Sequence, residues 1–155
     1  MNGDIARWLR ILGYDCLYLK DTRNLDKKIV NEAKRRGRIV LTADRGLFRK
    51  CVNEGVKAIY TLGESREDRL AYLIQRLGLD TSLENRPIRC SLCNDRLRRI
   101  GNKEISGTLP PKLVERYNEF WICLKCDKVY WQGSHWVGIK RTIELARFKA
   151  EEEKN

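Results

Sequence analysis

Four cysteines in the second half of this chain form two pairs whose spacing is typical of a metal site. Two residues separate Cys90 from Cys93 and Cys123 from Cys126, and 29 residues lie between the pairs. Two such pairs together can supply the four thiolate ligands of a structural zinc site. The alternatives are two disulfides or four unrelated buried thiols. Because the N-terminus lacks the apolar segment of a secretory signal, we expect zinc.

Acidic residues in the first half could bind a second, harder metal ion. Asp44 directly follows an apolar run at 38–43, and Asp26 opens a helical pattern after a loop that contains Asp21. Carboxylates at the carboxyl edge of a parallel sheet could hold Mg²⁺ or Mn²⁺ and assist phosphodiester hydrolysis. Asp44 and Asp26 also suit the N-cap of a helix, which is a purely structural role. The residues alone leave both interpretations open.

The apolar pattern of residues 1–85 predicts alternating helices and strands. We expect helices at 4–12, 26–36, 45–54 and 67–77, and strands at 16–19, 38–43 and 57–62. This alternation is typical of a parallel sheet that is flanked by helices. Such units usually begin with a strand, so we expect that a first strand is missing from this sequence.

Residues 86–155 are expected to form two further parts. The cysteine pairs lie in a predicted zinc ribbon at 86–136, and the long gap between them requires an insertion in its hairpin. A C-terminal segment at 137–155 follows, which is helical to about 153 by its apolar periodicity. The sequence thus predicts an α/β domain at 1–85, a small zinc ribbon and a C-terminal helix.

Charge and aromatic residues point to a nucleic acid as partner. The net charge is +11, of which residues 1–85 carry +5 and residues 86–155 carry +6. Arginines near the first helix and beside the acidic residues could contact phosphates, and aromatic residues after the second cysteine pair could stack on bases. A role in packing is the alternative for the tryptophans, and we expect Trp8 to be buried. The candidates for RNA binding are Arg7, Arg10, Arg45, Trp131, His135 and Trp136.

The overall composition bears on the cellular location and the source of the protein. No run of apolar residues is long enough to span a membrane, and we expect a soluble, cytoplasmic protein. Charged residues make up 34% of the chain and glutamine is nearly absent, a balance that suggests a thermophilic source.

Several segments together resemble the Mut-seven C-terminal RNase domain family, a branch of the PIN-like nucleases. They are Gly3 with IARWLRILGYD (5–15), Asp26, LTADRGL (41–47), both cysteine pairs, ERYNEFWIC (115–123) and VYWQGSHW (129–136). The resemblance implies a PIN-like α/β domain, a zinc ribbon and metal-dependent cleavage of RNA. By position, Asp26 and Asp44 match two acidic metal ligands, and Thr42 matches a hydroxyl residue that braces the carboxylate.

One departure from the family pattern concerns the acidic site. Members usually begin with an apolar strand that ends in Asp, a few residues before the glycine that matches Gly3, and this sequence starts after that strand. Two main hypotheses follow. The first is a Mg²⁺- or Mn²⁺-dependent ribonuclease whose zinc ribbon helps to hold RNA. The second is a non-catalytic RNA-binding or ribosome-associated protein that retains the nuclease fold, and a protein–protein adaptor built on the ribbon is a third reading.

Overall fold

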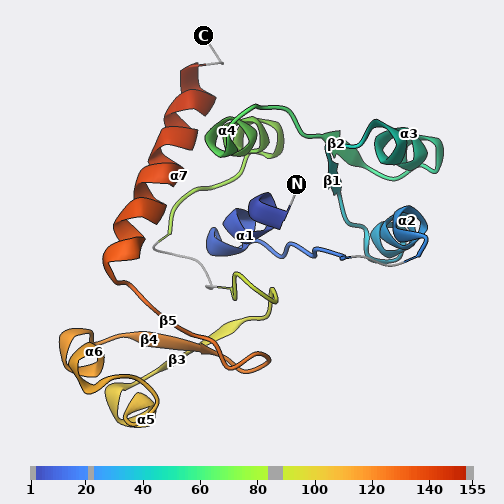
Figure 1. Cartoon of the computed structure of the whole chain (residues 1–155). Coiled ribbons are helices and arrows are strands. Elements are labelled where there is room, and N and C mark those ends of the chain that lie inside the picture. Colours follow the sequence, from blue (N-terminus) through green and yellow to red (C-terminus); the bar gives the residue numbers. More distant parts are fainter. Residues whose placement is uncertain (1–2, 21–22, 84–88, 153–155) are drawn as a thin grey trace.

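The computed structural model of the chain describes residues 3–20, 23–83 and 89–152 (Figure 1). The first half contains α1 (Gly3–Ile11), α2 (Leu25–Arg36), β1 (Val40–Thr42), α3 (Arg45–Asn53), β2 (Ala58–Tyr60) and α4 (Arg66–Leu77). The second half contains β3 (Leu97–Ile100), α5 (Asn102–Ile105), α6 (Pro111–Arg116), β4 (Phe120–Cys123), β5 (Val129–Trp131) and α7 (Ser134–Glu152). The mixed α/β architecture that the sequence predicts is confirmed.

A short parallel sheet lies among the helices of the first half. β1 and β2 pair in parallel, with Val40 opposite Ala58 and Thr42 opposite Tyr60. In the described part of the chain this sheet consists of β1 and β2. The predicted strand at 16–19 is wrong, because these residues form neither helix nor strand. The Cys16 N–H, which a strand would give to a neighbouring strand, instead donates to Asn94 Oδ1 at 3.0 Å.

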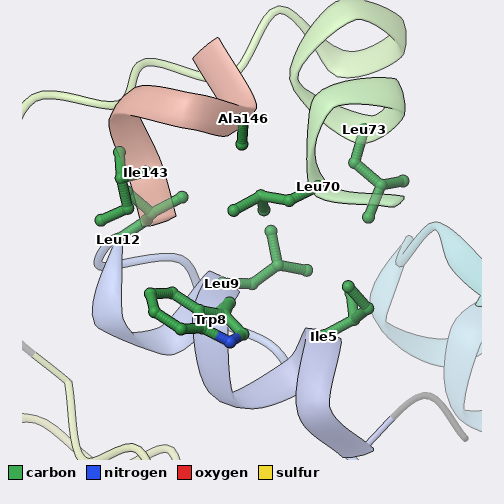
Figure 2. Packing of buried hydrophobic residues seen from close by; sticks show 8 residues of the cluster. All are labelled: Ile5, Trp8, Leu9, Leu12, Leu70, Leu73, Ile143 and Ala146. Atoms are coloured by element: carbon green, nitrogen blue, oxygen red, sulfur yellow. The ribbon is translucent and has the colours of Figure 1, made fainter. Parts of the chain in front are cut away.

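The main apolar core joins the two ends of the chain. Side chains of α1 and α4 meet those of α7, which returns from the second half to pack beside α4 (Figures 1 and 2). Trp8 is buried among them, as expected, with the Arg66 guanidinium 5.6 Å from its ring centroid. The cluster consists of Ile5, Trp8, Leu9, Leu12, Leu70, Leu73, Ile143 and Ala146.

The N-terminus of α4 is closed by a capping box and also anchors α7. Ser65 Oγ accepts a hydrogen bond from Asp68 N at 3.1 Å, and the Asp68 carboxylate accepts from Ser65 N at 3.0 Å. Lys149 of α7 donates to the same carboxylate. This bond from Lys149, followed by the bonds from Ser65, lowers the pKa of Asp68 and keeps it ionised. The capping box of α4 therefore also binds α7.

The second half contains an antiparallel sheet with a small core of its own. β3 pairs with β4 and β4 pairs with β5, with Phe120 opposite Ile100 on one side and Trp131 on the other. Phe120 is fully buried against Ile100 and Ile105. Helices α5 and α6 lie between β3 and β4, so they supply the insertion that the long gap between the cysteine pairs requires.

The turn before α4 gives a test of this packing. Gly63 has a φ of +122°, and a Cβ atom there would lie 2.6 Å from Arg69 N. We expect Gly63→Ala to lower the free energy of unfolding by about 1–3 kcal/mol, measured by urea denaturation. Gly138→Ala in α7 is the control, because a Cβ atom there meets nothing within 4 Å. The higher helix propensity of Ala should raise the free energy of unfolding of this variant by up to about 1 kcal/mol. Equal effects of both changes would contradict the close approach at Gly63.

Candidate functional site

The four cysteines that the sequence predicts as ligands come together at one end of the antiparallel sheet. Their Sγ atoms all lie within 4.8 Å of one another. The shortest separations are 3.4 Å for Cys93–Cys123, 3.5 Å for Cys90–Cys126 and 3.7 Å for Cys93–Cys126. A tetrahedron with Zn–S bonds of about 2.3 Å places its sulfurs roughly 3.8 Å apart, whereas a disulfide bond is about 2.05 Å long. The cluster fits a metal ion such as zinc, and it does not fit two disulfides.

Each cysteine pair sits on the same kind of tight turn, which we call a knuckle. Asn94 N donates to Cys90 O at 2.9 Å, and Asp127 N donates to Cys123 O at 2.8 Å. The residue after each second cysteine adopts a left-handed backbone, with φ of 74° at Asn94 and 59° at Asp127. Asn and Asp tolerate this conformation better than most residues, so their places after the two pairs are a sequence signal for the knuckles.

The surroundings of Cys90 favour its thiolate form. Burial alone would raise the pKa of Cys90. Hydrogen bonds from the Tyr130 hydroxyl, 3.1 Å away, and from backbone N–H groups outweigh the effect of burial and lower the pKa of Cys90 to about 6. Burial and the bond to Cys90 raise the pKa of Tyr130 to about 12, so its hydroxyl keeps the proton that it donates. Tyr130 thus supports a metal ligand from outside the cysteine set.

The first knuckle is docked on the α/β part through Arg10 of α1. The Arg10 side chain is 6% exposed and donates to Cys16 O at 2.8 Å and to the knuckle carbonyls of Ser91 at 3.2 Å and Leu92 at 2.9 Å. The sequence suggests Arg10 as a phosphate contact. The structure instead places its guanidinium in the interior, where it holds the knuckle.

Asn94 makes a second set of contacts across the same junction. Its Nδ2 donates to Asp15 Oδ1 at 2.6 Å, while its Oδ1 accepts from Cys16 N at 3.0 Å. Arg38 donates to the other oxygen of Asp15 at 2.9 Å. These bonds, that of Arg38 first and that of Asn94 second, lower the pKa of Asp15. The knuckle, Asp15 and Cys16 therefore form one hydrogen-bonded unit.

The acidic residue after β1 has a clear structural role and remains exposed. Asp44 is the N-cap of α3, and its Oδ1 accepts from Leu47 N at 2.7 Å. Thr42 is buried, and its Oγ1 accepts from Asp44 N at 3.0 Å, so it braces the backbone of this turn. Arg45, the next residue, is exposed in the first turn of α3.

Asp26 and Asp21 are the other predicted acidic ligands. Asp26 is exposed in the first turn of α2, where Asn24 occupies the N-cap position. Asp21 lies outside the described residues. Within the described ranges, the four cysteines are the one group of three or more His, Cys, Asp or Glu side chains that lie close enough to share an ion. The acidic metal site therefore stays a prediction.

A hollow of about 680 Å³ runs along β1, and its lining places Asp44 beside apolar side chains. Side chains of α1, α2 and residues 14–19 line it, and Thr42 and Asp44 belong to the same lining. Leu17 and Tyr18, which belong to the predicted strand at 16–19, are 43% and 37% exposed at this hollow.

Four of the predicted RNA-binding residues line a second hollow of about 390 Å³, between the antiparallel sheet, α1 and the start of α7. They are Arg7, Trp131, His135 and Trp136. Sequence reasoning missed Arg89, Lys128 and the rings of Trp121 and Tyr130, which share this lining. Nothing in their local spacing places them beside α1.

Comparison with known proteins gives one family match. The sequence model of the Mut7-C RNAse domain matches residues 1–143. No curated protein and no solved structure matches the chain. Among the described helices, none is long and apolar enough to cross a membrane.

The hydrogen bond from Tyr130 to Cys90 predicts a role in metal affinity. We expect Tyr130→Phe to weaken zinc binding about 10- to 100-fold, measured by competition with a colorimetric chelator, because the variant keeps the ring and loses the donor. Tyr60→Phe, a change of the same kind in β2 on the parallel sheet, is the control and should leave the affinity unchanged. Equal affinities of Tyr130→Phe and the unmodified chain would contradict this role.

Proposed function

The chain belongs to the Mut7-C RNAse domain family, and from this membership we propose that it is a metal-dependent ribonuclease whose zinc ribbon helps to hold RNA. The observation that carries the proposal is the extent of the match, which spans the parallel sheet, both knuckles and much of α7. The net charge of +11 supports a polyanionic substrate. In this proposal the cysteine cluster holds zinc and has a structural role.

We place the catalytic metal at the carboxyl edge of the parallel sheet. Asp44 and Asp26 would supply carboxylate ligands to Mg²⁺ or Mn²⁺, with Asp21 as a further candidate. Such an ion activates water and stabilises charge on the phosphate. Thr42 would position Asp44 through the hydrogen bond that it accepts from the Asp44 backbone. Arg45, exposed beside Asp44, suits a contact with the phosphate backbone of RNA.

We also propose a separate role for each of three parts of the chain. The α/β domain at 1–85 would carry the cleavage site, and the ribbon at 86–136 would contribute to RNA binding. The segment 137–155 would close the core, which is supported by the packing of Ile143 and Ala146 of α7 on α1 and α4.

The test is Mn²⁺-dependent cleavage of labelled single-stranded RNA by the unmodified chain and by Asp44→Asn. Asn is as good an N-cap as Asp, so the variant should keep the fold while it loses a charged ligand. We expect the cleavage rate to fall on the order of 100-fold or more, with RNA affinity nearly unchanged. Asp127→Asn is the matched control, because it makes the same chemical change at a left-handed position that also suits Asn.

Three results would contradict parts of this proposal. Undiminished cleavage by Asp44→Asn, or an equal loss of cleavage and RNA binding, would exclude Asp44 as a metal ligand. Absence of cleavage by the unmodified chain, with RNA still bound, would favour the non-catalytic RNA-binding protein.

A further inference from the structure

The hollow between the ribbon and α1 has a lining that suits one particular ligand. Aromatic rings come from β4, β5 and α7, and cationic side chains come from α1, the first knuckle and the turn between β4 and β5. We propose that this hollow binds an unpaired base of an RNA strand, with the neighbouring phosphates held at its cationic rim. This inference rests on the proposed function, and it narrows the substrate to RNA with single-stranded bases.

The aromatic residues of the hollow differ from core residues in their exposure. Trp131 and Trp136 are only partly buried, whereas Trp8 in the main core is 8% exposed. Trp131 packs one side on the ribbon core and lies edge-to-face with His135, with ring centroids 5.9 Å apart. Tyr130 uses its hydroxyl to contact Cys90 and keeps its ring in the lining. Part of each indole surface thus remains available to stack on a base.

The turn between β5 and α7 fixes these rings in place. A Cβ atom on Gly133 would lie 2.8 Å from Trp131 Nε1 and 3.3 Å from His135 Nδ1, so the backbone approaches both rings closely. Trp136 N donates to Gly133 O at 2.9 Å, which ties the first turn of α7 to the same glycine. A surface held in this way loses little conformational entropy when it binds a ligand.

The charged residues of the lining all have one sign. Arg7, Arg89 and Lys128 line the hollow, and the described lining includes no carboxylate. Arg7 and Lys128 are exposed, while Arg89 donates to Asn94 O at 2.9 Å and so stays next to the first knuckle. Cationic side chains attract phosphates, and aromatic faces stack on any base, so the combination suits a nucleotide of variable sequence.

The geometry of nucleic acids then limits which RNA can use the hollow. In a duplex the bases are paired and stacked inside, and proteins contact mainly phosphates and 2′-hydroxyls. An unpaired base in a loop, a tail or a single strand can turn outward and enter an aromatic pocket. The hollow should therefore distinguish single-stranded from double-stranded RNA.

The test measures RNA binding by the zinc-loaded chain without added Mg²⁺ or Mn²⁺, so that it does not depend on cleavage. Fluorescence anisotropy compares a labelled single-stranded RNA with a blunt duplex of the same sequence. We expect the single strand to bind at least about tenfold more tightly, and Trp136→Ala to weaken its binding about 5- to 150-fold, the range for loss of one base stack. Trp136→Phe retains an aromatic face and should restore most of the affinity. Binding of the duplex should change little in either variant.

A charge variant tests the rim independently of any effect on folding. Lys128→Gln should reduce the slope of log affinity against log salt by about 1, the value for one phosphate contact. Lys125→Gln makes the same change in the same turn at an exposed residue outside the lining, and it should leave the slope unchanged.

The outcomes separate this inference from the proposed function. Equal affinity for single strand and duplex, or unchanged single-strand binding in both Trp136→Ala and Lys128→Gln, would overturn the base pocket, while cleavage by the unmodified chain would still support a ribonuclease. Failure of the unmodified chain to bind either RNA would overturn the proposed function and the pocket with it.

Discussion

One buried contact, the docking of the first knuckle on Arg10, joins the ribbon to the α/β part. A buried guanidinium is costly unless hydrogen bonds compensate it, and Arg10 finds its acceptors in Cys16 and in two carbonyls of the knuckle. Those carbonyls hold their positions only while the knuckle keeps its turn. A metal ion held by the four cysteines would thus also fix Arg10, Asp15 and Cys16.

This contact makes α1 the shared element of both hollows. Ile5 and Leu9 belong to the main core and line the hollow along β1, while Arg7 and Ile11 line the hollow beside the ribbon. Helix α7 strengthens the arrangement, because its first turn borders the ribbon hollow and its later turns pack on α4 (Figure 1). The two hollows therefore belong to one packed unit.

The sequence was informative wherever the determining contacts are local. The cysteine spacing predicted the cluster, and helices α1 to α4 and α7 and strands β1 and β2 followed from periodicity and end signals. The short helices α5 and α6 of the insertion were not predicted. The strand at 16–19 failed because a strand also needs a neighbour, which periodicity does not supply. Arg10 was misplaced because its knuckle acceptors are 81 and 82 residues away in the chain. The sequence named Arg7 and Trp136 as candidates for RNA binding but did not predict the hollow that they line, because α1 and α7 reach it only through the fold.

We expect that a metal ion bound by the four cysteines stabilises the α/β part as well as the ribbon. Hydrogen–deuterium exchange on the full chain, zinc-loaded and after chelation, measures this coupling. Chelation should speed exchange in the ribbon and also at residues 15 and 16 and the end of α1, where Asn94 and Arg10 bind. Faster exchange confined to the ribbon amides, with residues 15 and 16 as protected as before, would show that the first knuckle does not stabilise the α/β part.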